Sequence, residues 1–234
     1  FTGKKITREN LARAVEAHNR NRRAMRALYD LRKADPPPIS GTEMMKVLVA
    51  AMSLPVDEST ALIEGVAREM GQRKAASAKG GARIMLVGDQ IDDVAIIDAI
   101  EGTGARLVMD DLSMGSKLYW QDVDATDDPI DGIAERYLRK LKLPMTYVGI
   151  GDTYEENLKA RFGHMVQYVK DFKVNGVILL VYKYCDPYGF EVPAVKSFIE
   201  SAGTPLLYIE DEYSVSSLAR LKTRIEAFLE MIAP

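Results

Sequence analysis

The spacing of apolar residues changes about a third of the way along the chain. Before Arg83, apolar residues recur every three or four positions, which predicts amphipathic helices. These helices are expected over residues 7–33, 42–53 and 57–72. After Arg83, short continuous apolar runs alternate with amphipathic stretches, as is typical of strands buried on both faces of a parallel sheet. We therefore expect a helical segment over residues 1–80 and a Rossmann-like α/β domain over residues 81–234.

The apolar runs predict four strands, separated by helices with recognisable starts. The runs are RIMLVG (83–88), ARLVMD (105–110), GVILLVY (176–182) and TPLLYIE (204–210). The helices are expected over residues 92–101, 128–140, 153–173 and 192–201, with a last one opened by Ser214 or Ser216. Thr7, Asp128 and Thr153 are good N-caps, and Glu156 completes a capping box with Thr153. Right-handed crossovers then give a small doubly wound sheet, most simply in the order 2-1-3-4.

This topology places a ligand crevice between the first and third strands, at their carboxyl ends. Gly88, Asp89 and Gln90 follow the first strand, and Cys185 follows the third. A free Cys is often an inert buried residue, but Cys185 lies after the apolar run, beside Asp186. From the residues alone it is an inert thiol, a metal ligand, or a nucleophilic or redox thiol.

Composition indicates a cytoplasmic protein. The chain contains one Cys in 234 residues, so no disulfide forms within it. No apolar run approaches the roughly 18–20 residues of a membrane span, so no membrane partner is expected. Residues 1–34 carry ten Lys and Arg against three acids, a local charge of +7 in a chain of net charge −3. Such a helix either contacts a phosphorylated ligand or acidic partner, or neutralises the rest of its own protein.

Other familiar motifs are absent or incomplete. No zinc-finger or RNA-binding pattern accompanies the basic helix, so nucleic acid is not expected as a partner. No phosphate-binding GxxxxGK[ST] loop is present, and GIGDTY (149–154) lacks the third glycine of a dinucleotide fingerprint. The acidic run DVDATDD (122–128) lacks the Gly and Glu of a calcium loop. His18 and His164 have no partner spacing, so we expect them at the surface or at an interface.

Several motifs together resemble the D-component subunits of the 2-hydroxyacyl-CoA dehydratases. The specific ones are NGVI (175–178), KYCDP (183–187), EVP (191–193) and TRIEAFLE (223–230). The helical stretches KKITRENLARAVEAHNRNRRAMRALYDLRK (4–33) and PPPISGTEM (36–44) are also similar, so the resemblance covers essentially the whole chain. The same superfamily contains the active-site subunits of ATP-dependent benzoyl-CoA reductase.

The resemblance implies a [4Fe-4S] cluster held by three cysteines in each subunit. Cys185 matches the last of the three, and the other two lie in an N-terminal α/β domain that these 234 residues do not contain. We therefore expect a C-terminal part of a longer subunit, which the start at Phe1 favours, or a shortened relative without a complete cluster site. This chain alone is expected to be inactive. The expectation that Gly88, Asp89 and Gln90 line the crevice rests on topology only.

The resemblance also implies partners and a radical mechanism. A second homologous subunit and an ATP-hydrolysing iron–sulfur activator assist, which agrees with the missing phosphate-binding loop. One electron converts an (R)-2-hydroxyacyl-CoA to a ketyl radical that loses its 2-hydroxyl group, and loss of a β-proton and return of the electron give the 2-enoyl-CoA. The alternatives are reductive dearomatisation of benzoyl-CoA, a non-catalytic scaffold relative, and a small-molecule-binding domain with an inert Cys185.

Overall fold

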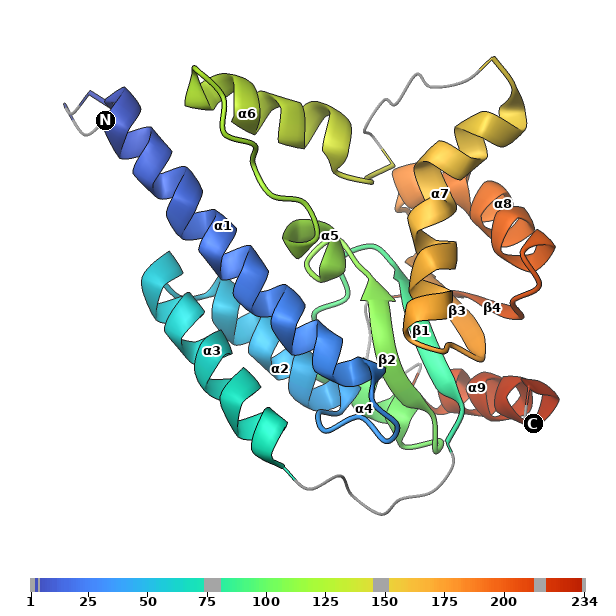
Figure 1. Cartoon of the computed structure of the whole chain (residues 1–234). Helices are drawn as coiled ribbons and strands as arrows, with labels where there is room; N and C mark the ends of the chain where they lie inside the picture. Colours follow the sequence, from blue (N-terminus) through green and yellow to red (C-terminus); the bar gives the residue numbers. More distant parts are fainter. Residues whose placement is uncertain (1–2, 4, 74–80, 145–151, 213–217, 233–234) are drawn as a thin grey trace.

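The described residues form a parallel β-sheet covered by helices (Figure 1). The computed structural model describes residues 3, 5–73, 81–144, 152–212 and 218–232. The strands are β1 (Arg83–Gly88), β2 (Arg106–Asp111), β3 (Gly176–Tyr182) and β4 (Leu206–Asp211). All neighbouring strands are parallel and their order is β2-β1-β3-β4, which confirms the predicted fold class and strand order. The carboxyl ends of β1 and β3 therefore lie side by side.

The helices fall into two groups. The helices before the sheet are α1 (Arg8–Asp30), α2 (Gly41–Met52) and α3 (Val56–Gln72). Those within the α/β part are α4 (Val94–Glu101), α5 (Ser116–Tyr119), α6 (Pro129–Glu135), α7 (Tyr154–Asp171), α8 (Asp186–Ser201) and α9 (Leu218–Ile232). A 3₁₀ turn (Leu31–Lys33) extends α1, and a π-helical turn (Arg136–Lys140) extends α6. None of the helices among the described residues is long and apolar enough to cross a membrane.

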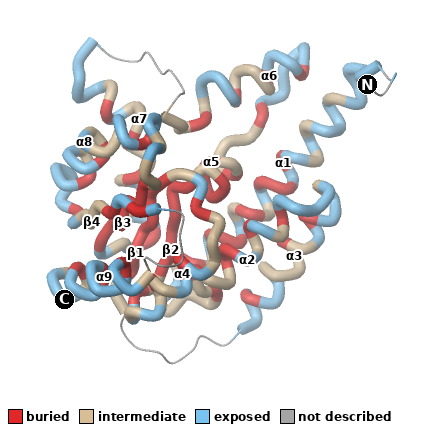
Figure 2. The backbone as a smooth tube through the Cα atoms, turned by 180° about the vertical axis from the view of Figure 1, so that it is seen from behind, coloured by how far each residue is buried: buried red, intermediate tan, exposed pale blue. Residues whose placement is uncertain are grey.

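The sheet is sandwiched between two helical layers. Helices α7 and α8 contact each other on one face, and α4 and α9 contact each other on the other (Figure 1). All six residues of β1 are buried, and the buried positions concentrate in the strands and on the helix faces turned toward them (Figure 2). This explains why the strands are continuous apolar runs and the helices are amphipathic.

Local sequence signals define where the helices begin. Thr7 accepts a hydrogen bond from the Asn10 backbone nitrogen, and Thr153 and Glu156 form the predicted capping box. Asp128 caps α6, whose first residue is Pro129, as expected. The predicted cap of the last helix, Ser214 or Ser216, lies outside the described residues.

The helices α1 to α3 share one hydrophobic core with the sheet. Met25 and Leu28 of α1 belong to the same cluster of buried side chains as the strands. At the start of α2, the Glu101 carboxylate of α4 accepts hydrogen bonds from the backbone nitrogens of Gly41 (2.7 Å) and Thr42 (2.9 Å). The predicted boundary near residue 80 adjoins residues 74–80, which the structure does not describe, so the division into two domains stays a prediction.

One helix begins earlier than predicted. The pattern placed the helix after the third strand at residues 192–201, whereas α8 begins at Asp186, directly after Cys185. Pro187 lies in the first turn of α8, where its fixed φ and missing N–H are compatible with a helix. The predicted start was therefore wrong, and Pro193, which removes one backbone donor, lies inside α8. Cys185 is therefore the N-cap residue of a helix and not part of a long loop.

Candidate functional site

Cys185 lies in a tight connection between β3 and α8. Its backbone nitrogen donates to the Tyr182 carbonyl at 3.1 Å, and its carbonyl accepts from the Gly189 nitrogen at 2.8 Å. The preceding residue, Tyr184, has a left-handed φ of 67°, which is uncommon for a residue with a side chain. The Cys185 side chain makes no capping bond and is partly exposed. The turn therefore presents the thiol at the carboxyl end of β3.

The partner of the thiol is Asp89, one of the three crevice residues named from topology. The Cys185 thiol donates to the Asp89 Oδ2 atom at 3.0 Å. Burial raises the pKa of this thiol, and the Asp89 carboxylate raises it further. The thiol consequently stays protonated at neutral pH unless a cation approaches the sulfur atom.

The structure separates the other two crevice residues from this contact. A side chain at Gly88 would place its Cβ atom 2.2 Å from the Leu180 carbonyl oxygen, so Gly88 permits the close approach of β1 and β3. Gln90 is exposed. Of the three residues named from topology, the structure brings Asp89 alone to Cys185.

Hydrogen bonds connect Asp89 to the segment after β2. The Ser113 hydroxyl lies 3.4 Å from Asp89 Oδ1 and 2.9 Å from the Tyr188 hydroxyl. The Lys117 ammonium lies 5.8 Å from the centroid of the buried Tyr188 ring. The first turn of α8 is thereby connected to β1 and to the segment after β2, and the environment of Cys185 is built from three parts of the sheet edge.

A buried ionic cluster lies beyond Tyr188. The Lys117 ammonium contacts the Asp111 carboxylate and donates to the Asp111 carbonyl oxygen at 2.6 Å. His164 Nε2 lies 3.0 Å from Asp111 Oδ1. Burial by itself would raise the pKa of Asp111, but Lys117 and His164 hold it well below its usual range. Burial by itself would lower the pKa of Lys117, but Asp111 leaves it raised. Asp111 and Lys117 are therefore both charged at neutral pH.

The ionic cluster contains residues that sequence reasoning missed. His164, expected at the surface or at an interface, is partly buried, with 19% of its side chain exposed, and it contacts Asp111. Lys117 and Asp111 were not named beforehand. One available signal was the pair of acids that ends the apolar run of β2, because acids at the carboxyl end of a buried strand need partners.

A shallow groove of about 300 Å³ borders the thiol. Its walls include Tyr182, Cys185, Tyr208 and the exposed aromatic rings of Tyr184 and Phe190. Among the described residues, no group of three or more His, Cys, Asp or Glu side chains has a metal-binding arrangement. The site fits a single thiolate contribution to a metal centre, since Cys185 is the one cysteine of the chain.

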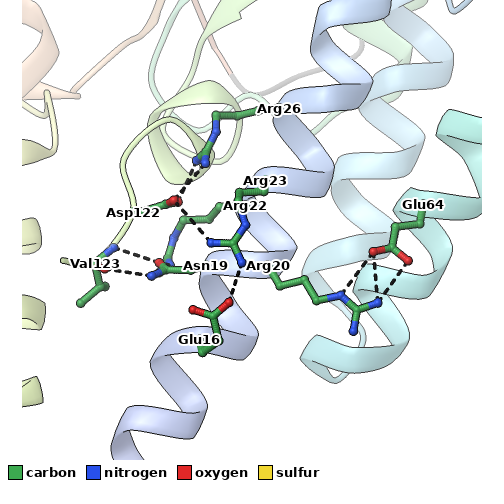
Figure 3. Close-up of polar contacts among 9 residues, drawn as sticks. All are labelled: Glu16, Asn19, Arg20, Arg22, Arg23, Arg26, Glu64, Asp122 and Val123. Carbon is green, nitrogen blue, oxygen red and sulfur yellow. Dashed lines mark hydrogen bonds and ion pairs between the residues drawn. The ribbon is translucent and has the colours of Figure 1, made fainter. Parts of the chain in front are cut away.

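Three arginines of the basic first helix are paired with acids of the protein itself. Arg20 pairs with Glu64, and Arg23 pairs with Glu16 (Figure 3). Arg26 binds Asp122, the first residue of the acidic run 122–128, which lacks the Gly and Glu of a calcium loop. These contacts agree with the interpretation that the helix balances charges of its own protein.

Fold and site together define a parallel α/β protein that presents one thiol where the order of its strands reverses. The sequence profile of the family described as "2-hydroxyglutaryl-CoA dehydratase, D-component" matches residues 1–232. The chain belongs to this family, which confirms the resemblance seen in the motifs.

Individual relatives carry related descriptions. The chain is 30% identical over 240 residues to a "Putative dehydratase subunit YjiM" of Escherichia coli, covering 98% of this chain and 59% of the relative. It is 27% identical to the "(R)-phenyllactyl-CoA dehydratase beta subunit" of Clostridium sporogenes, covering 99% and 59%. It is 21% identical to one of the subunits of a benzoyl-CoA reductase from Thauera aromatica, covering 93% and 54%. The chain thus spans a little over half the length of these relatives.

Proposed function

We propose that the chain is part of a 2-hydroxyacyl-CoA dehydratase subunit. The complete enzyme would remove water from an (R)-2-hydroxyacyl-CoA to give a 2-enoyl-CoA. The observation that carries this proposal is the family match over residues 1–232, combined with a partly exposed Cys185 at the carboxyl end of β3. Relatives named as dehydratase subunits support the reaction class.

Within that enzyme, Cys185 would be one thiolate ligand of a [4Fe-4S] cluster. The remaining cysteine ligands would come from outside residues 1–234, because the chain contains no second cysteine. When bound, such a cluster supplies one-electron chemistry at low potential. Replacing Cys185 with Ser should accordingly lower the iron content of the complete subunit, and unchanged iron content would refute the assignment.

The residues around Cys185 have definable tasks in this proposal. The thiol must lose its proton before the sulfur atom binds a metal. Asp89 Oδ2, at 3.0 Å, is the acceptor that the structure places against that proton. Ser113 and Tyr188 hold the surrounding segments together, so they would orient Asp89 and Cys185 and would not react.

The complete enzyme would require two protein partners. These are a second homologous subunit and an ATP-hydrolysing iron–sulfur activator that delivers the electron. Relatives described as the beta subunit of a dehydratase and as one subunit of a reductase support an assembly of several subunits. Omission of the activator or of ATP should therefore abolish turnover in a reconstituted assay.

A second candidate reaction is ATP-dependent reduction of benzoyl-CoA. The relative named as a benzoyl-CoA reductase subunit supports it. The deciding experiment supplies the anaerobically purified complete enzyme and activator with (R)-2-hydroxyacyl-CoA thioesters and with benzoyl-CoA. Dehydration should consume no net reductant per product formed. Consumption of reductant in proportion to product, with benzoyl-CoA alone as substrate, would overturn the dehydratase proposal.

A further inference from the structure

A second pocket lies between α1, the α2–α3 connection, α5 and the end of α6. Its volume is about 250 Å³, and no residue that lines it also lines the groove beside Cys185. His18 and Arg22 of α1 face Arg136, which begins the π-helical turn after α6. The pocket therefore gathers two guanidinium groups from positions 114 residues apart in sequence.

Arg136 is buried with an unsatisfied donor. The residue is 1% exposed. Its Nε atom donates to the Gln121 carbonyl at 2.8 Å, and Nη2 donates to the Leu118 carbonyl at 2.6 Å. Its buried Nη1 atom has no hydrogen-bond partner among the described residues. A buried charged donor without an acceptor is unfavourable, so its presence calls for a specific explanation.

Arg22 differs from Arg20, Arg23 and Arg26, its neighbours on α1. Figure 3 shows Arg20, Arg23 and Arg26 directed at carboxylates, whereas Arg22 donates to the neutral Asn19 Oδ1 atom at 2.6 Å. Arg22 is 8% exposed, and no carboxylate of the described residues forms an ion pair with it. It is thus a second buried guanidinium whose charge is not matched by a neighbouring acid.

The two guanidiniums act on each other and on His18. Burial lowers the pKa of Arg22 to about 10, and the positive charge of Arg136 contributes to the same shift. Burial also lowers the pKa of His18, with further lowering from Arg22 and Arg136. Burial lowers the pKa of Arg136 as well. The Asp122 carboxylate opposes the lowering of the pKa at Arg22 and Arg136, but it is already bound by Arg26. The pocket consequently carries a positive potential at neutral pH.

We propose that this pocket binds the phosphate group of a small organic anion. Guanidinium groups bind phosphate oxygens through paired hydrogen bonds. A phosphate would supply an acceptor for the Arg136 Nη1 atom and a negative charge beside both guanidinium groups. The exposed lining of the pocket includes Met52 (48% exposed), Leu54 (38%) and the ring of Tyr137 (53%), which suit the organic portion of the ligand. The site is independent of the Cys185 assignment.

The test is calorimetric titration of the complete subunit with inorganic phosphate at constant ionic strength. We expect one saturable site per chain. Arg22→Gln and Arg136→Gln should each weaken binding at least tenfold. Arg20→Gln is the matched control, since Arg20 lies on the same helix but is exposed and paired with Glu64, and it should change the affinity less than twofold.

Folding of each variant is checked by circular dichroism. Arg136 holds two carbonyls, so Arg22→Gln provides the test if Arg136→Gln does not fold. Competition between coenzyme A and inorganic phosphate for the pocket then shows whether the phosphate belongs to the acyl carrier or to a separate molecule. Absence of saturable phosphate binding by the folded wild-type subunit would overturn the proposal. An equal loss of affinity in Arg20→Gln would also overturn it. A third contradictory result is an Arg22→Gln variant that binds phosphate normally but assembles poorly with the second subunit, which would point to a partner carboxylate.

Discussion

The ionic cluster near the sheet edge and the arginine pair beside α1 are both buried, but they are balanced differently. Asp111 faces Lys117 and His164, so opposite charges and hydrogen bonds offset the cost of removing them from water. Arg22 and Arg136 form no ion pair with a carboxylate of the described residues, and each raises the electrostatic cost of the other. In the first arrangement the buried charges of Asp111 and Lys117 are paired, although the buried Nδ1 atom of His164 has no hydrogen-bond partner among the described residues. The second is incomplete, which favours an external anion.

The largest expected effect is the loss of Lys117. Lys117→Met leaves the buried Asp111 carboxylate without its ammonium partner and with the hydrogen bond to His164, so the free energy of unfolding should fall by about 3–5 kcal/mol. Urea denaturation at pH 7 measures this effect. A decrease below about 1 kcal/mol would show that the cluster is not a source of stability, and the contrast with the arginine pair would disappear.

A pH series sharpens the role of Asp111. Its folded-state pKa is lowered, so its contribution is present above its unfolded-state pKa of about 4 and is lost as pH falls through the folded-state value. Asp111→Asn should therefore reduce the free energy of unfolding by about 2–3 kcal/mol at pH 7. The difference between variant and wild type should shrink below about pH 4. A difference that stays constant down to pH 2 would contradict the assigned protonation state.

The substitution of the arginine pair that corresponds to Lys117→Met is Arg22→Met, measured in phosphate-free buffer. The variant loses one hydrogen bond to Asn19 but also removes a repulsive buried charge. The free energy of unfolding should thus change by less than about 1 kcal/mol. If this substitution costs as much as Lys117→Met, then Arg22 has an intramolecular role like that of Lys117, and the anion site loses its rationale.

The smallest expected effect on stability is at Cys185. Its side chain makes no capping bond, whereas Ser is a preferred N-cap residue. Cys185→Ser should therefore change the free energy of unfolding by no more than about 0.5 kcal/mol. Thermal unfolding of the subunit without metal checks this value. A clear destabilisation would indicate that the thiol is a packing residue.

The sequence predicted the strand order because buried runs and capped helices follow simple local rules. It also placed Cys185 and Asp89 at one edge of the sheet, where the thiol and the carboxylate meet. It did not predict the early start of α8, which begins at Asp186 and contains both Pro187 and Pro193. Motif spacing alone predicts local features more readily than contacts between distant segments.

Sequence patterns did not predict the buried charged groups, because the residues that meet there are far apart along the chain. Asp111 and His164 are 53 residues apart, and crossovers of the chain bring them together. Arg22 appeared as one member of a basic run, and the structure was needed to distinguish it from its paired neighbours (Figure 3). Their identity as buried charges depends on burial and on partner geometry, neither of which has a local signature.

The most direct test of the central claim is iron and acid-labile sulfide analysis of the complete subunit, expressed and purified without oxygen. If Cys185 is a cluster ligand, wild-type protein should contain about four iron and four sulfide per subunit. The Cys185→Ser variant should lose most of both while remaining folded, and the neighbouring Tyr184→Phe should retain them. Equal iron and sulfide in Cys185→Ser and wild type, or no iron in the wild-type subunit, would contradict the account.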